Sequence, residues 1–523
     1  MTTGNTPGSH QEMSVTCDAL SNEQAGHIRH IDNLSRQLPN DWSFMQSKAF
    51  GQEDFGGYRF QLSYMAYALA LAHVHRLPNA PGVFKPIFER LIGKLLLPEV
   101  WTYWRDVSRG GAVFNAHLTA SLKEEWDPVG RDNIMYSAYV QSVTALYHHL
   151  FDDDQYQQPG ALSFEFWSFF WGGEPKSFPY DERTLNEHLY WQMVESGFIG
   201  IACEPNCAFQ ICNQPAILGF RMNDLVNGGR MADEVTTSYE KVWTDLGRLD
   251  STGHYNMMRL QDSGTVLPNA ASAPWIDAWC GTLMNMWNRE FVRANYPRQI
   301  KDFVLDLADG LKTIVDVPPG QIMGQTVEND TCDFGWVATW ASEMGDHELL
   351  EGLLAYADRY MNPTWLNGGL FYPRNDTKRD EAGNLIGMEP LTGNALLAYA
   401  RLNVPDGLWK LYNHPWGVEH HNEPNLTAVG DDISVSQARF DAERNTLTFR
   451  VQRHAERHGD GAITINNIVN GRCHLAVDGR DISDTSNADT SCVDVDPRGS
   501  VLRITVPAGE PHTYSLRVGS EVK

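Results

Sequence analysis

The feature that most constrains the fold is an alternation of two kinds of helical segment between residues 23 and 403. Some segments are apolar on nearly every side, such as YRFQLSYMAYALALAHVHRL from Tyr58. Others are amphipathic, such as FKPIFERLIGKLLL from Phe84. A helix that is apolar all round must be buried, and amphipathic helices can cover it. About a dozen helices in this order predict an all-α (α/α)6 barrel, or toroid, over residues 21–410.

The same pattern predicts where individual helices lie. Segment 132–151 predicts an inner helix with Asp132 or Asn133 as its N-cap, and 199–223 predicts an inner helix that carries cysteines. Residues 298–311 are typical of an outer helix. These predictions rest on the position of apolar side chains alone.

The residue pattern changes after residue 403. Residues 411–424 are rich in Pro, Gly and His and predict a linker. Short alternating runs such as TLTFRVQR and TYSLRV follow, separated by turn sequences such as DAERN and DPRG. They predict a small antiparallel, β-sandwich-like domain over 425–523. The polar residues 1–20 are expected to be disordered.

Charge and targeting signals narrow the classes of partner. The formal net charge is −25, which disfavours nucleic acid and anionic membrane surfaces. No run of 18 apolar residues occurs, so we expect no membrane span. The first residues lack a basic and an apolar region, and the chain has eight cysteines, so we expect a cytoplasmic protein with reduced thiols.

Three of the cysteines, Cys203, Cys207 and Cys212, lie within ten residues of each other. Buried cysteines often serve only as small apolar groups. If a helix begins near Pro205, however, Cys203 lies at its N-terminus, where the pKa of a thiol falls. No C-x-x-C pair, phosphate-binding loop, H-E-x-x-H or Asp-rich magnesium motif occurs, so we expect neither a metal nor a cofactor.

Several segments together resemble one enzyme family. They are Cys203-Glu204-Pro205-Asn206 with Phe209 and Cys212-Asn213, Asn133-Ile134-Met135-Tyr136, Tyr64-Met65-Ala66-Tyr67-Ala68, Val100-Trp101 with Trp104, Glu343-Met344-Gly345-Asp346, and the run from Trp275 to Tyr296-Pro297. In this order they are similar to the linalool dehydratase-isomerase family over about residues 25–403. The β-rich end lies outside the resemblance.

The resemblance implies an (α/α)6 barrel and metal-free dehydration or isomerisation of an unsaturated alcohol. By position it implies that Asp32, Cys203, Cys212 and Tyr139 are catalytic. The expected substrate-binding residues are Tyr136, Glu204, Phe209, Phe60 and Tyr64. The family's oligomers, in which a neighbour closes the pocket, imply a homo-oligomer.

The chain also departs from the family. Tyr139 replaces the family's histidine, Leu38 replaces a tyrosine, and Phe60 falls near another family tyrosine, beside Tyr58 and Arg59. The family's secretion signal is missing. We therefore expect a different substrate from linalool: an apolar terpenoid- or polyketide-like alcohol or polyene of specialised metabolism, which the enzyme dehydrates, isomerises or cyclises without a cofactor.

Such a reaction needs an acid near the hydroxyl and a base near an adjacent C–H bond. Asp32 is the expected acid, and Cys203 or Cys212 is the expected base or covalent partner. Two alternatives remain open: a carbohydrate-active (α/α)6 hydrolase, lyase or epimerase, and a non-catalytic ligand-binding relative. A sugar site would show facing carboxylates and stacked tryptophans, whereas an isoprenoid site would be dry and aromatic with the thiols inside.

Overall fold

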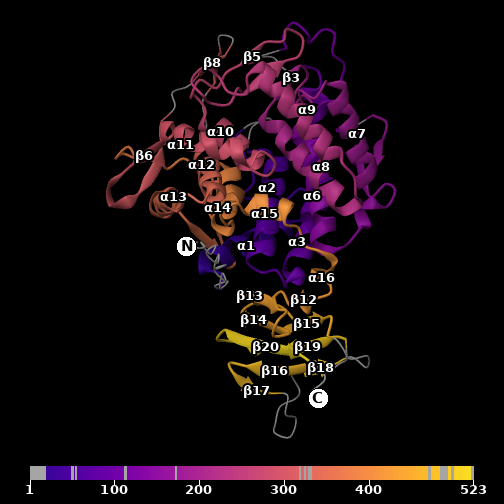
Figure 1. The fold of residues 1–523 in the computed structure, drawn as a ribbon, viewed down its shortest axis with the longest axis vertical. Helices are drawn as coiled ribbons and strands as arrows, with labels where there is room; N and C mark the ends of the chain where they lie inside the picture. The colour runs from indigo at the N-terminus through magenta and orange to yellow at the C-terminus, as the bar shows by residue number, and fades with distance from the viewer. Residues whose placement is uncertain are drawn as a thin grey trace, which may run out of the picture.

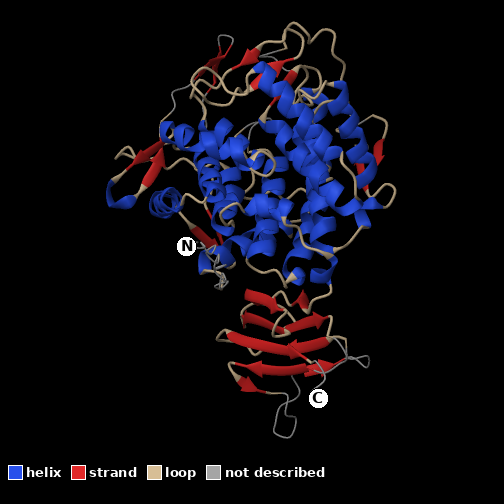
Figure 2. Ribbon diagram, viewed as in Figure 1, coloured by secondary structure: helices blue, strands red, loops and turns tan. Residues whose placement is uncertain are grey.

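The computed structural model describes residues 19–48, 52, 56–110, 115–170, 173–316, 320–322, 325–327, 332–468, 473–482, 493–495 and 500–519. The segment predicted to be disordered, 1–20, lies outside the described residues except for Ala19 and Leu20. The described chain is rich in helices up to His421 and consists mainly of strands beyond it (Figure 1, Figure 2).

The buried helices form a closed ring. They are α2 (Tyr58–His75), α6 (Ile134–Phe151), α8 (Gln214–Asn227), α10 (Pro274–Met284), α12 (Cys332–Met344) and α14 (Leu397–Leu402), the last preceded by a π-helical turn at Thr392–Leu396. Each helix packs against the next in this order, and α14 packs against α2. Every residue of α10 is buried, as the apolar pattern predicted.

Amphipathic helices cover the ring from outside. They are α1 (Asn22–Ser35), α3 (Pro81–Leu95), α7 (Glu182–Glu195), α9 (Met231–Leu246), α11 (Arg289–Gln299) and α13 (His347–Tyr360), with the short helices α4 (Pro98–Trp101) and α5 (Tyr103–Val107). Helix α9 shows the principle, because it buries Val235, Tyr239 and Trp243, which lie four residues apart. Outer helices therefore contribute one apolar stripe each.

Short hairpins interrupt the helical part. They are β1 (Leu162–Phe166) with β2 (Lys176–Tyr180), β3 (Cys207–Phe209) with β4 (Met258–Leu260) and β5 (Val266–Leu267), β6 (Val304–Asp306) with β7 (Lys312–Ile314), β8 (Gly320–Ile322) with β9 (Gln325–Val327), and β10 (Thr364–Leu366) with β11 (Gly369–Phe371).

Two segments differ from the expectation. The outer helix predicted over 298–311 ends at Gln299, and the β6–β7 hairpin follows instead. Asp309 and Gly310 both have positive φ there, which reverses the chain and stops a helix. The predicted linker contains α15 (Gly407–Asn413), which begins before it, and α16 (Val418–His421).

Two antiparallel sheets follow the helices. One sheet has the order β12 (Asn425–Val429), β15 (Ala462–Asn466), β19 (Leu502–Thr505), β18 (Val493–Val495). The other has the order β13 (Ile433–Asp441), β14 (Thr446–Arg453), β20 (His512–Val518), β16 (Cys473–Val477), β17 (Arg480–Asp481). The inward residues of both sheets, such as Phe449 and Ile465, belong to one apolar core.

Backbone hydrogen bonds join the strands to the helices. The N–H of Leu20 donates to the carbonyl of Ser436 at 2.8 Å, and the N–H of Leu426 donates to the carbonyl of Asn79 at 2.8 Å. The N–H of Phe440 donates to Oδ1 of Asn79, also at 2.8 Å. The sheets therefore lie directly on α1 and on the loop after α2 (Figure 1). Among the described helices, none has the length and apolar character needed to cross a membrane.

Candidate active site

The cysteine segment is a turn and a strand, and the prediction of a helix over 199–223 is wrong for its first half. Helix α8 begins only at Gln214. The N–H of Cys203 donates to the carbonyl of Cys207 at 2.9 Å, and the N–H of Cys207 donates to the carbonyl of Glu204 at 3.0 Å. Asn206 closes this turn with a φ of 75°, which asparagine tolerates and a helix does not. Cys203 and Cys207 therefore share no helix face.

The amide of Asn213 holds the segment in place. Its Oδ1 accepts from the N–H of Ile201 at 2.8 Å, and its Nδ2 donates to the carbonyls of Ile201 at 3.0 Å and Phe209 at 2.9 Å. Gly200 has a φ of 120°, and a Cβ atom there would lie 2.5 Å from Nδ2 of Asn213. The glycine is thus required for both its backbone conformation and the close contact.

The start of helix α6 is tied to the same segment. Asn133 occupies the predicted N-cap position, but its side chain does not cap the helix. Instead, the N–H groups of Asn133 and Ile134 donate to the carbonyls of Cys203 and Ala202, both at 3.2 Å. The Oδ1 atom of Asn133 accepts from the hydroxyl of Tyr103 at 2.5 Å. Carbonyl groups of the cysteine segment therefore accept hydrogen bonds from N–H groups at the start of α6, the helix that carries Tyr139.

Cys203 and Cys212 form a buried pair. Each thiol is among the groups that shift the pKa of the other. Burial raises the pKa of Cys203 well above its usual value and also raises the pKa of Cys212. The prediction of a lowered thiol pKa is therefore wrong, because Cys203 lies in an apolar interior and not at a helix N-terminus. Both groups are thiols at neutral pH.

Two charged side chains act on the pair. Glu204 opposes ionisation of both thiols and raises their pKa, whereas the Arg59 guanidinium lowers the pKa of Cys203. Arg59 is buried, and its guanidinium lies over the ring of Phe60 at 4.3 Å and the ring of Tyr103 at 4.1 Å. The positive charge of Arg59 therefore lies against two aromatic rings and also acts on the Cys203 thiol.

Aromatic rings from the inner helices form a cluster that includes Tyr139. The ring of Tyr139 meets the edges of Phe60 and Tyr64, each with centroids 5.8 Å apart. Tyr64 in turn contacts Trp336 at 4.8 Å, and Trp336 stacks on Trp279 at 4.5 Å. We call Phe60, Tyr64, Tyr139, Trp279 and Trp336 the aromatic wall.

Tyr139 links the aromatic wall to the thiols. Burial raises its pKa well above the usual value, and the charges that act on it include Cys212 and Arg59. The hydroxyls of Tyr139 and Tyr64 are buried and interact with each other, but neither has a partner of good hydrogen-bond geometry among the described residues. A buried hydroxyl without such a partner is available to a polar group of a ligand.

Most of the predicted site residues are brought together. Glu204 acts electrostatically on Cys203 and Cys212, Cys212 acts on Tyr139, and Phe60 and Tyr64 contact Tyr139.

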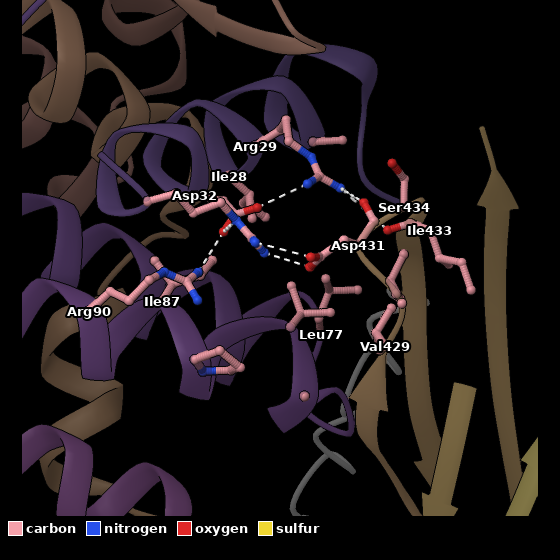
Figure 3. A pocket seen from close by; sticks show the side chains of 17 residues that line it. Ile28, Arg29, Asp32, Leu77, Ile87, Arg90, Val429, Asp431, Ile433 and Ser434 are labelled. Atoms are coloured by element: carbon pink, nitrogen blue, oxygen red, sulfur yellow. Dashed lines mark hydrogen bonds and ion pairs between the residues drawn. The ribbon is translucent and has the colours of Figure 1, made fainter. Parts of the chain in front are cut away.

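Asp32, predicted to be the catalytic acid, lies apart from the cysteine pair of its own chain. It is buried on α1, where its carboxylate bonds Arg90 at 2.6 Å and Arg29 and Arg36 at 2.9 Å (Figure 3). These arginines come from α1 and α3, beside the β-sheets, and none of them is among the groups that act on the cysteine pair. Asp32 is an anchor in an ion-pair network and does not lie at the cysteines of its own chain.

Tyr136 and Phe209 also have other roles than expected. The Tyr136 hydroxyl donates to the carbonyl of Leu95 at 2.7 Å, and its ring packs on Phe164. Phe209 lies half-buried on β3, paired with Met258. Tyr136 therefore packs α6 onto α3, and Phe209 belongs to the small sheet beside the cysteines.

The sequence reasoning missed Arg59, Tyr103 and the two tryptophans. Nothing in the sequence signalled the burial of Arg59, because a charged residue at the start of an apolar helix is usually exposed. Phe60 and Tyr64 were predicted, and spacings of four and three residues place them with Tyr67 on one helix face. Trp279 and Trp336 come from helices far apart in the sequence and gave no signal. Among the described residues, no three His, Cys, Asp or Glu side chains are grouped as metal ligands.

The fold and the site define a helical protein with buried thiols set beside an inner aromatic wall. A family model described as linalool dehydratase/isomerase matches residues 59–378. The chain therefore belongs to the linalool dehydratase/isomerase family, which places it among enzymes of the lyase and isomerase type.

Solved structures show weaker similarity. An α-1,6-mannanase of Salegentibacter sp. HEL1_6 has 11% identity and a TM-score of 0.41, with 72% of this chain and 98% of that chain covered. The Lin0763 protein of Listeria innocua has 10% identity and a TM-score of 0.39, with 72% and 97% covered. An α-amylase of Clostridium perfringens has 11% identity and a TM-score of 0.37, with 73% and 97% covered.

Proposed function

We propose that this enzyme is a cofactor-independent dehydratase, isomerase or cyclase of an apolar unsaturated alcohol or polyene, of terpenoid or polyketide type. The observation that carries the proposal is the buried Cys203–Cys212 pair beside Tyr139 and the aromatic wall. The closed ring of buried helices supports an (α/α)6 barrel as the scaffold.

The two thiols have different roles in the proposed reaction. Cys212 acts electrostatically on both Cys203 and Tyr139, so we assign to it the proton exchange with the substrate. In the proposed reaction Cys212 protonates the substrate hydroxyl, the C–O bond breaks and water leaves. The Cys212 thiolate then takes a proton from the adjacent carbon, the double bond forms, and the thiol is restored.

In this reaction Cys203 stabilises the transient thiolate by donating a hydrogen bond to Sγ of Cys212. The hydroxyls of Tyr139 and Tyr64 orient the substrate hydroxyl. The faces of the aromatic wall stabilise positive charge on the allylic carbons, and the dry surroundings keep water from capturing the cation. Glu204 raises the pKa of the Cys203 thiol and Arg59 lowers it.

The surroundings of the pair favour this function over action on sugars. A glycoside hydrolase needs two carboxyl groups on either side of the bond that breaks. The described groups that act on Cys212 are Cys203, Cys207, Cys280 and the carboxylate of Glu204. Thiols and aromatic rings are suited to an apolar substrate.

The test is incubation of the purified full chain with a panel of monoterpene, sesquiterpene and diterpene allylic alcohols, followed by gas chromatography with mass spectrometry. We expect loss of water or a shifted double bond for at least one alcohol. The Cys212→Ala variant should form no product. Tight binding without turnover of any alcohol would point to the non-catalytic alternative and contradict the proposal.

A further inference from the structure

A second, positively charged cleft lies between α1 and the strands β13 and β14. Its volume is about 570 Å³, within the range of small-molecule sites. It shares Arg29 and Ser434 with a neighbouring cleft of about 290 Å³ around Asp32, which Figure 3 shows. It is formed by the helical part and the β-sheets together, apart from the cysteine pair.

Arg457 is the central cation of the cleft. It is half-buried, and its Nη1 donates to Oγ of Ser434 at 3.1 Å. No carboxylate of the described residues forms an ion pair with it. Burial lowers the pKa of Arg457 and the charge of Arg29 lowers it further, whereas the carboxylates of Glu456, Asp32 and Asp432 raise it. The two guanidinium groups repel each other across the cleft. Repulsion of this kind is relieved when an anion enters.

The charges that line the cleft are unbalanced. Its arginines are Arg29, Arg450 and Arg457, against the carboxylate of Glu23. Arg29 already bonds Asp32 at 2.9 Å, but the side chain of Arg450 is exposed and has no ion pair among the described residues. The whole chain carries a net charge of −25, so a local excess of positive charge is unusual for it.

Polar and aromatic groups complete the lining. Oγ of Ser434 lies between Arg457 and Nε2 of His454, which it meets at 2.9 Å, and Ser436 adds a second hydroxyl. The ring of Trp365 is 52% exposed at the edge of the cleft and offers a flat apolar face. Guanidinium groups and hydroxyls match the oxygens of a phosphate, and an aromatic ring matches an organic body.

We propose that this cleft binds a phosphorylated small molecule, with its phosphate on Arg457 and Arg450. The site is separate from the cysteine pair and does not depend on the function proposed for that pair. It would give the enzyme a second ligand, held where the β-sheets meet the helices.

The test is isothermal titration calorimetry of the full chain with inorganic pyrophosphate, with sodium chloride added to keep the ionic strength constant. We expect saturable binding. Arg457→Gln should weaken it at least about tenfold, because a charge-assisted hydrogen bond is lost. Arg450→Gln, at an exposed position that does not threaten the fold, should weaken it several-fold.

Arg480→Gln is the matched control, since Arg480 is an exposed arginine on β17, at the opposite edge of the sheet from β13. It should bind as the wild type does. Absence of saturable heat, or equal weakening by Arg480→Gln, would overturn the proposal. So would co-sedimentation with phosphatidic acid vesicles without binding of pyrophosphate, which would mean that a lipid surface is the partner.

Discussion

The backbone N–H of Asn133 donates to the carbonyl of Cys203 at 3.2 Å. This one bond joins two segments that lie 70 residues apart in the sequence: the start of helix α6, which carries Tyr139, and the turn that carries the first cysteine of the pair. Because Asn133 and Cys203 are buried, the distance between Tyr139 and the thiols is fixed by main-chain geometry. A site held in this way is organised before a substrate binds.

Tyr139→Phe tests the role of the hydroxyl. The variant keeps the ring that contacts Phe60 and Tyr64, so we expect little change in stability. The loss of a hydrogen bond to the substrate should lower kcat/KM by about ten- to a hundredfold. The measurement is steady-state kinetics with the best alcohol found in the panel.

Tyr136→Phe is the matched control, three residues away on the same helix. Its hydroxyl bonds the carbonyl of Leu95, so the variant should lose about 1 kcal/mol of stability and keep its kcat/KM. If Tyr136→Phe lowered kcat/KM as much as Tyr139→Phe, the assignment of Tyr139 to the site would be wrong.

Asp32→Asn separates anchoring from catalysis. The variant leaves the guanidinium groups of Arg29, Arg36 and Arg90 without their shared carboxylate, in a buried setting. We expect a loss of about 2–3 kcal/mol in the free energy of unfolding, measured by chemical denaturation. Turnover at a temperature where the variant is folded should stay within a few-fold of the wild type.

Asp431→Asn provides the comparison for Asp32. Asp431 pairs with Arg36 but its side chain is 59% exposed, so its removal should cost less than about 1 kcal/mol. A hundredfold loss of turnover in Asp32→Asn, with stability intact, would restore Asp32 as the catalytic acid.

Asp132 should make stability depend on pH. Burial raises its pKa from 3.8 to about 6. The folded state then holds the proton more tightly than the unfolded state, so stability falls as the pH rises from about 4 to about 6. Asp132→Asn removes this cost and should stabilise the chain by about 3 kcal/mol at pH 7.5 and hardly at all at pH 4.

The measurement for Asp132 is the melting midpoint of both proteins across this pH range. Its φ of 55° suits asparagine as well as aspartate, so the substitution adds no backbone strain. Parallel stability curves for the two proteins would contradict the assigned pKa.

Much of the fold followed from apolar patterning. Helix α2 is apolar on all sides and is buried, and each strand expected from the runs TLTFRVQR and TYSLRV is present, as β14 and β20. The segment 298–311 failed because its apolar residues alternate in a way that also suits the β6–β7 hairpin. Periodicity over a short segment does not distinguish an outer helix from a β-hairpin.

Cys203, Cys212 and Tyr139 were predicted to be site residues, but the geometry around them was not. The spacing of Cys203 and Cys207 suits a helix, yet Pro205 and Asn206 form a turn there, and burial then reverses the expected thiol pKa. Arg29 and Arg36 flank Asp32 at helical spacings, so two of its three ion pairs are local, whereas Arg90 lies 58 residues away in the sequence. The cysteine turn is also held by local hydrogen bonds, which spacing alone does not predict.

The most direct test of the account compares single-turnover rates of the wild type with those of the Cys203→Ala, Cys212→Ala and Cys207→Ala variants. All three thiols are buried in the same segment, so the variants share any general effect of removing one. We predict that Cys212→Ala and Cys203→Ala each slow dehydration at least about a hundredfold, and that Cys207→Ala stays within about threefold of the wild type. Equal rates in all three variants would contradict the claim that the Cys203–Cys212 pair is the reaction centre.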